Sequence, residues 1–138
     1  MKLLGAHMSI AGGLHLAVER AAKAQCDALQ IFTRSSNQWK VKPLEEPEAA
    51  IFREKQLEHG VAPAFAHDSY LINLASPDPV LHARSEAAFG EEIDRCDALG
   101  LPYLVAHPGA HMGAGEEAGI DRIAGSLSRL FAARPASR

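Results

Sequence analysis

Short apolar runs alternate with segments of helical periodicity along the whole chain, and this alternation is the feature that most limits its possible folds. The apolar runs lie at about residues 2–6, 28–32, 63–67 and 103–107. They do not alternate apolar and polar residues cleanly, which fits strands that are buried on both faces. A regular β-α-β-α order is typical of α/β proteins with a parallel sheet. The order predicts about four β-α units, which form either a small open sheet or half of a (β/α)8 barrel of about 250 residues.

Local signals define the helices between these runs. Residues 14–21 place their apolar side chains at the i, i+3, i+4, i+7 spacing of one helix face. Pro47 suits the first turn of a second helix and Gly60 its end, while residues 77–79 begin a third helix that ends at Gly100. A fourth helix begins near residue 116. We therefore predict one α/β domain over residues 1–138, with no linker.

Composition narrows the classes of function. Hydrophobic residues make up 47% of the chain and charged residues 22%, as in a globular protein. No stretch approaches the about 20 apolar residues of a membrane span, so we expect no membrane partner. The net charge of −3 argues against a general nucleic-acid binder. Cys26 and Cys96 lack a C-x-x-C spacing, and we interpret them as buried thiols in a reducing cytoplasm.

Histidines follow the apolar runs. His7 directly follows the first run, and the third and fourth runs end on His67 and His107. Parallel α/β folds place their chemistry at the carboxyl ends of strands, and neutral imidazoles suit zinc, manganese or iron. His67 and His107 are the leading metal-ligand candidates, and His7 and His111 are weaker ones. The alternative for each is a buried histidine that is hydrogen-bonded to the backbone.

The loops after the second and third runs add further candidates. Tyr70 and Leu71 follow His67, where they either pack into the core or form an exposed apolar wedge that enters duplex DNA. The loop from Arg34 to Lys40 offers cations, amides and one tryptophan, a mixture that can contact phosphates and bases. Asp68 is the only carboxylate at a strand end, whereas multi-metal hydrolytic sites need several. We assign no catalytic residue.

At these positions the sequence resembles the endonuclease IV family of apurinic/apyrimidinic endonucleases over essentially residues 1–130. The resemblance rests on several motifs in order along the chain: Gly5-Ala6-His7-Met8-Ser9, Leu29-Gln30-Ile31-Phe32 followed by Asn37-Gln38-Trp39, residues 67–75 (HDSYLINLA) and His107-Pro108-Gly109-Ala110-His111. The last two motifs are the most specific.

The resemblance implies a TIM barrel with three zinc ions, which cleaves the backbone of damaged double-stranded DNA on the 5′ side of abasic sites in base-excision repair. It places two zinc-binding histidines at His67 and His107, and DNA-penetrating residues at Tyr70 and Leu71. A third DNA-inserting position, usually arginine in the family, falls on Asn37.

The resemblance also implies that the family's other zinc ligands, a bridging glutamate among them, belong to the second half of the barrel. We expect the 138 residues to form the amino-terminal half barrel and to be inactive alone. We also expect self-association through open barrel edges, with Leu4, Ile31, Phe65 and Val105 facing inward. The rival interpretations are a metal-dependent sugar isomerase or epimerase barrel, which the loops after His67 and His107 disfavour, and a non-catalytic remnant.

Overall fold

The predicted alternation of strands and helices is confirmed by a computed structural model, which describes residues 2–135. The strands form one parallel sheet in the order β1-β2-β3-β4, so each strand pairs with the next one along the chain. This is the order of successive units in a (β/α)8 barrel. The strands are β1 (Gly5–His7), β2 (Ala28–Phe32), β3 (Ala64–His67) and β4 (Leu104–Val105).

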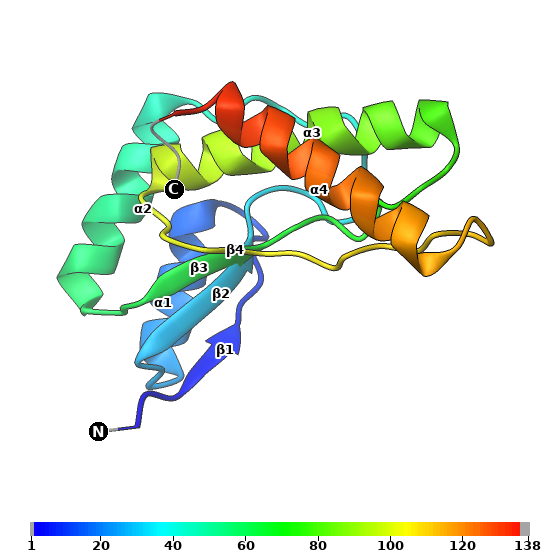
Figure 1. Cartoon of the computed structure of the whole chain (residues 1–138). Coiled ribbons are helices and arrows are strands. Elements are labelled where there is room, and N and C mark those ends of the chain that lie inside the picture. Colours follow the sequence, from blue (N-terminus) through cyan, green and yellow to red (C-terminus); the bar gives the residue numbers. More distant parts are fainter. Residues whose placement is uncertain (1, 136–138) are drawn as a thin grey trace.

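The helices follow the strands and pack side by side along one face of the sheet (Figure 1). Their ends agree with the sequence signals. The Asp78 carboxylate accepts hydrogen bonds from the Val80 and Leu81 amides at the start of α3, and glycines in the left-handed region, Gly60 and Gly100, end α2 and α3. The helices are α1 (Leu14–Lys23), α2 (Glu46–His59), α3 (Pro79–Leu99) and α4 (Glu116–Ala132).

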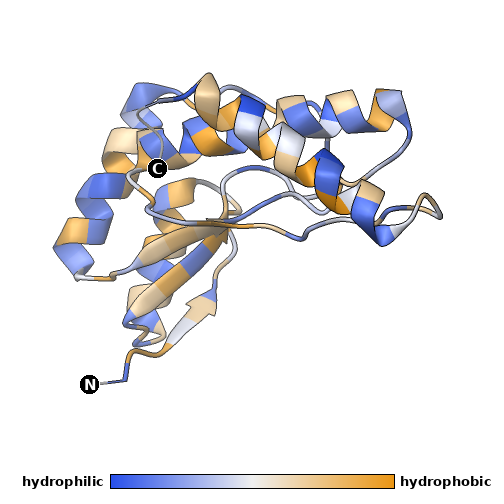
Figure 2. Ribbon diagram, viewed as in Figure 1, coloured by the Kyte–Doolittle hydropathy of each residue, from blue (hydrophilic) through white to orange (hydrophobic). Residues whose placement is uncertain are grey.

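The core lies between the sheet and the helices. Leu29 and Ile31 of β2 are fully buried there against α1 and α2, together with Ala64 and Ala66 of β3. A second cluster joins α3 and α4 to the segment after β3. Figure 2 shows apolar residues concentrated on the strands and polar ones interspersed along the helices. None of the helices within residues 2–135 is long and apolar enough to cross a membrane.

The opposite face of the sheet carries the residues that lead to the site. The register pairs Gln30 with Phe65 and Phe32 with His67, so these side chains share the face that the helices do not cover. Phe65 and Val105 lie on this face as predicted, whereas Leu4 precedes β1 and is exposed. The prediction for Ile31 is wrong: strand alternation turns it to the helix side, where it is fully buried.

The outer strands are shorter than the sequence predicts. Pairing in β1 begins at Gly5 rather than at residue 2, and pairing in β4 is limited to Leu104 and Val105, so His107 lies in the following loop. Each of these strands has one neighbour in the described sheet. An apolar run with hydrogen bonds on only one side keeps fewer of its residues in regular strand geometry.

Candidate functional site

Aromatic and imidazole rings gather where the strands end. His7, Phe32 and His67 are the last residues of β1, β2 and β3. The ring centroids of His7 and Phe32 are 4.5 Å apart, and those of Phe32 and His67 are 5.6 Å apart. His107 lies 5.0 Å from His67 by the same measure. The structure thus brings together the histidines that the sequence places at strand ends.

The hydrogen bonding of His67 favours the ring tautomer that leaves Nε2 free to bind a ligand. Its Nδ1 lies 2.8 Å from the backbone oxygen of Asp68. A carbonyl oxygen only accepts hydrogen bonds, so Nδ1 carries the proton and donates it. In the neutral ring the lone pair is then on Nε2, as in metal-binding histidines whose other nitrogen donates to a carbonyl group. Both interpretations of His67 are therefore compatible: its ring is bonded to the backbone and still has a free donor atom.

Asp68 lies beside this ring but is buried. Its exposed fraction is 1%, and neither carboxylate oxygen has a hydrogen-bond partner of good geometry within residues 2–135. Its Oδ1 is 3.5 Å from His67 Nδ1. Burial raises the pKa of Asp68 to about 6, while the His67 ring and the nearby backbone amides of His107 and Asp68 oppose that increase. Asp68 is thus a neighbour of the ring and not a solvent-facing carboxylate.

The donors present suit zinc in kind but not in number. Stable zinc sites use three or four protein ligands. Within residues 2–135, no three side chains of histidine, cysteine, aspartate or glutamate are grouped so that they could hold a metal ion. The described residues therefore do not fit a complete zinc centre.

The candidate DNA-contacting residues lie at the same edge of the sheet. Tyr70 is 65% exposed, and its ring packs edge-on against Phe32 at 5.2 Å and against His67 at 5.7 Å. Core packing is therefore excluded for Tyr70, whereas Leu71 is half-buried. Asn37 is exposed in the β2–α2 loop and accepts a hydrogen bond from the Ser35 hydroxyl. The Ser69 hydroxyl donates to the backbone oxygen of Ser36 at 2.8 Å and so joins the two loops.

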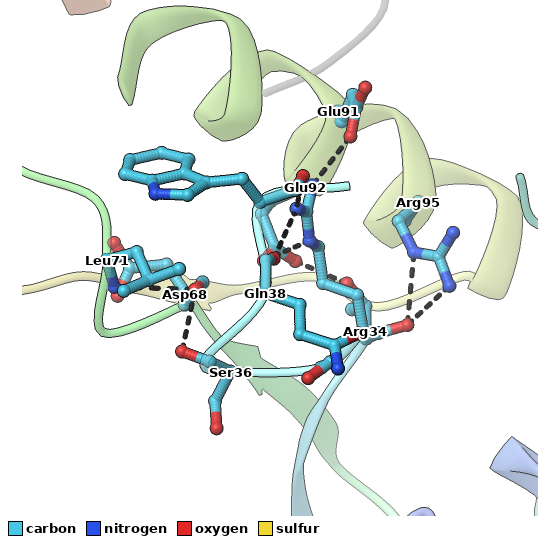
Figure 3. A network of polar contacts seen from close by, with 12 residues as sticks. Arg34, Ser36, Gln38, Asp68, Leu71, Glu91, Glu92 and Arg95 are labelled. Carbon is cyan, nitrogen blue, oxygen red and sulfur yellow. Dashed lines mark hydrogen bonds and ion pairs between the residues drawn. The ribbon is translucent and has the colours of Figure 1, made fainter. Parts of the chain in front are cut away.

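Arg34, one of the cations that the loop 34–40 offers, is buried and does not face this edge. Its guanidinium is buried and donates to Glu91 Oε2 at 2.6 Å and to the backbone oxygens of Gln38 and Trp39 (Figure 3). Ion pairs with Glu91 and Glu92 on α3 stabilise the Arg34 side chain in this buried position. The site keeps the exposed Lys40 from this loop.

A polar network that the sequence did not predict surrounds the buried Arg34. Glu92 accepts a hydrogen bond from the Thr33 hydroxyl, and Arg95 donates to the Thr33 carbonyl oxygen through Nε at 3.0 Å. Desolvation raises the pKa of Glu92, while Thr33, Arg34 and Arg95 favour its charged form. One sequence signal points to this network. Glu91, Glu92 and Arg95 lie together on a side of α3 that is otherwise apolar. The network attaches the β2–α2 loop to α3.

The weaker histidine candidates have structural partners. His111 Nδ1 accepts the backbone N–H groups of Gly113 and Gly115, both at 3.2 Å, just before α4 begins. His7 Nδ1 lies 3.0 Å from the Gln30 side-chain oxygen. The Nδ1 atoms of both residues are thus engaged within the protein.

Comparisons with known proteins agree with this architecture. The family model described as "Xylose isomerase-like TIM barrel" matches residues 18–136. The probable endonuclease 4 of Chloroflexus aurantiacus (strain ATCC 29366 / DSM 635 / J-10-fl) is 48% identical over 132 residues, which are 96% of this chain and 46% of that protein. The probable endonuclease 4 of Geobacter sulfurreducens is 52% identical over 132 residues, or 96% of this chain and 45% of that protein.

Solved structures match in the same way. Endonuclease IV from Thermus thermophilus aligns with a TM-score of 0.83 and 32% identity, covering 95% of this chain and 46% of that one. A D-psicose 3-epimerase aligns with a TM-score of 0.68 at 17% identity, covering 95% of this chain and 48% of that one, which shows the shared fold alone. The chain spans about half the length of the curated relatives it matches. The chain therefore belongs to the xylose isomerase-like TIM barrel family, and the resemblance to endonuclease IV proteins that its motifs predict is confirmed.

Proposed function

We propose that this chain supplies half of the active site of an apurinic/apyrimidinic endonuclease, a hydrolase that cleaves DNA on the 5′ side of abasic sites during repair. The observation that carries the proposal is the pair of imidazole rings 5.0 Å apart, His67 at the end of β3 and His107 in the loop just after β4. This pair lies in a chain whose sequence is 48% and 52% identical to two proteins named probable endonuclease 4.

His67 and His107 are, in this proposal, two of the ligands of a zinc site. The bond from His67 Nδ1 to the Asp68 carbonyl supports the role, because it leaves Nε2 available. Two imidazoles alone hold zinc weakly, and in this proposal the remaining ligands come from the second half of the barrel, as the family resemblance implies. We expect the isolated chain to lose zinc on dialysis and to leave an abasic duplex uncut.

Tyr70, Leu71 and Asn37 are the proposed contacts to damaged double-stranded DNA. An exposed ring that is supported from behind by Phe32 can enter between bases without first leaving a core position. Because the net charge is −3, DNA binding by the isolated chain is expected to be weak and sensitive to salt.

The experiment is complementation. The chain is mixed with the complementary half of a full-length relative and incubated with a duplex that carries an abasic analogue. Nicking is expected on mixing, and His107→Ala is expected to abolish it, while His59→Ala, a change at an exposed position on α2, serves as the matched control. If the halves associate and no strand is cut, the chain is a non-catalytic remnant and the proposal fails.

The two cysteines bear on where the protein is located. Both cysteines are free thiols, and burial raises the pKa of Cys96 to about 12, so this thiol is unreactive. Free thiols are typical of reducing compartments, which supports a cytoplasmic location.

We also propose that the uncovered sheet face mediates self-association. The sugar epimerase alternative is supported by fold alone.

A further inference from the structure

The loops that follow His67 and His107 are joined through one side chain, that of Asn73. Asn73 Nδ2 donates to the backbone oxygen of Ala110 at 3.0 Å, and the Ala110 amide donates to Asn73 Oδ1 at 3.0 Å. The Asn73 side-chain amide therefore both donates to and accepts from the Ala110 backbone, as paired residues of two neighbouring strands do. Asn73 belongs to the loop between β3 and α3, and Ala110 follows His107 in the next loop.

Asn73 is itself held rigidly. Its backbone amide donates to the hydroxyl of Ser85 on α3 at 3.0 Å, and Ser85 is fully buried. Its Oδ1 also accepts the amide of Ala75 at 3.1 Å, and the flanking residues Ile72 and Leu74 are buried in the second core cluster. The side chain is thus fixed by its own loop and by α3, independently of its bonds to Ala110.

The second loop is shaped to approach this side chain closely. Gly109 has a φ of +93°, and a Cβ atom there would collide with Asn73 Oδ1. Both observations require glycine at this position. Among the described residues, two other side-chain contacts join these loops, and both are weaker. One is the hydrogen bond from the Ser76 hydroxyl to Met112 Sδ at 3.7 Å, and the other is the Asp68 carboxylate beside the His107 amide, without good hydrogen-bond geometry.

We propose that Asn73 is a positioning residue, which sets the distance between His67 and His107. His107 needs such a support because regular pairing in β4 ends two residues earlier, at Val105. The Asn73–Ala110 bonds hold the backbone three residues after His107 and so limit the positions that its ring can take. The inference rests on the proposed function for what the two histidines bind, but the geometric link can be tested without a metal ion.

Two variants break the link from opposite sides. Asn73→Asp keeps the shape and the Oδ1 acceptor, but it places a carboxylate oxygen against the Ala110 carbonyl where the amide donated before. Gly109→Ala leaves Asn73 intact and pushes the second loop away from it. The matched control is Ser69→Ala, which removes a hydrogen bond from the same β3–α3 loop to Ser36, in a loop without a candidate metal ligand.

Two measurements on the whole 138-residue chain follow the effect. The first is the nuclear Overhauser effect between the ring protons of His67 and His107. The second is zinc affinity, from the shift of the His67 and His107 ring resonances as excess zinc is added, because two imidazoles alone bind zinc weakly. Both broken-link variants are expected to weaken the inter-ring effect and to lower zinc affinity about tenfold or more, the range for residues that support metal ligands. Ser69→Ala is expected to lower thermal stability but to leave both measurements unchanged.

The outcomes separate the inference from the proposed function. If the wild-type chain shows no inter-ring effect, or if a folded Asn73→Asp variant keeps it undiminished, the positioning role is overturned. If His67→Ala leaves zinc affinity unchanged, the proposed metal site fails, and the inter-ring measurement still decides the role of Asn73. If Gly109→Ala does not fold, Asn73→Asp carries the test.

Discussion

Arg34 is the residue whose environment departs most from what its sequence position predicts. The Arg34 side chain is 1% exposed and lies between Glu91 and Glu92 of α3. Replacing it with methionine keeps most of its volume but leaves Glu92 buried without its nearest cation. Removing one partner of a buried ion pair costs about 3–5 kcal/mol. We expect Arg34→Met to lower the free energy of unfolding, measured by urea denaturation, by about 3 kcal/mol.

Glu91 provides the control for that measurement. It bonds the same guanidinium, but its side chain is 61% exposed, so Glu91→Ala is expected to cost under about 1 kcal/mol. Adding Glu92→Gln to Arg34→Met is expected to recover part of the lost stability, since the uncompensated charge is then absent. Equal costs for Arg34→Met and Glu91→Ala would contradict the buried-pair explanation.

At the residue level, the sequence predicts what depends on local position. His67 and His107 were identifiable because each ends an apolar run, and strand ends meet at one edge of a parallel sheet. Arg34 was not, because its burial depends on a carboxylate 57 residues away on another element. The bond between Asn73 and Ala110 was equally hidden, since it spans 37 residues and pairs a side chain with a backbone.

At the scale of single elements, the start of α4 depends on a histidine that lies outside it. His111 Nδ1 accepts the N–H groups of Gly113 and Gly115, and Gly115 itself provides no side-chain cap for the helix. A capping side chain is worth about 1 kcal/mol. We therefore expect His111→Ala to lower the free energy of unfolding by about that amount. Hydrogen exchange of the amides at residues 113–119 should accelerate in the variant.

The exposed His59 on α2 is the comparison for His111. Because its side chain is in solvent, His59→Ala is expected to change stability by less than about 0.5 kcal/mol. If His111→Ala leaves exchange in this segment unchanged, the contact does not stabilise the start of α4.

The elements themselves were predicted to differing extents for a physical reason. The ends of α2 and α3 depend on proline, aspartate and glycine within a few residues, so the sequence alone locates them. The ends of β1 and β4 depend on neighbouring strands. The apolar runs at residues 2–6 and 103–107 were recognisable, but β1 has only three residues and β4 only two.

For the whole molecule, the decisive feature is that the described sheet is open. A closed barrel pairs its first and last strands, whereas β1 and β4 here each pair on one side, and the face with Phe65 and Val105 has no helix over it within residues 2–135. The helix-facing side is well packed, so the open face is the part of the described fold that lacks a partner. Exposed sheet edges and apolar faces favour association between copies of a chain.

This openness leads to a prediction about Val105, which is 41% exposed and pairs in register with His67. We expect the molar mass from light-scattering chromatography to rise with concentration in the wild-type chain. Val105→Lys should shift the population toward monomer, because a contact that buries this position would have to desolvate the ammonium group. Val80→Lys on α3, at a position that is 76% exposed, adds the same charge away from the open face and should leave the association unchanged. A monomeric mass at every concentration, together with cooperative unfolding, would show that the half barrel is stable with its inner face in water.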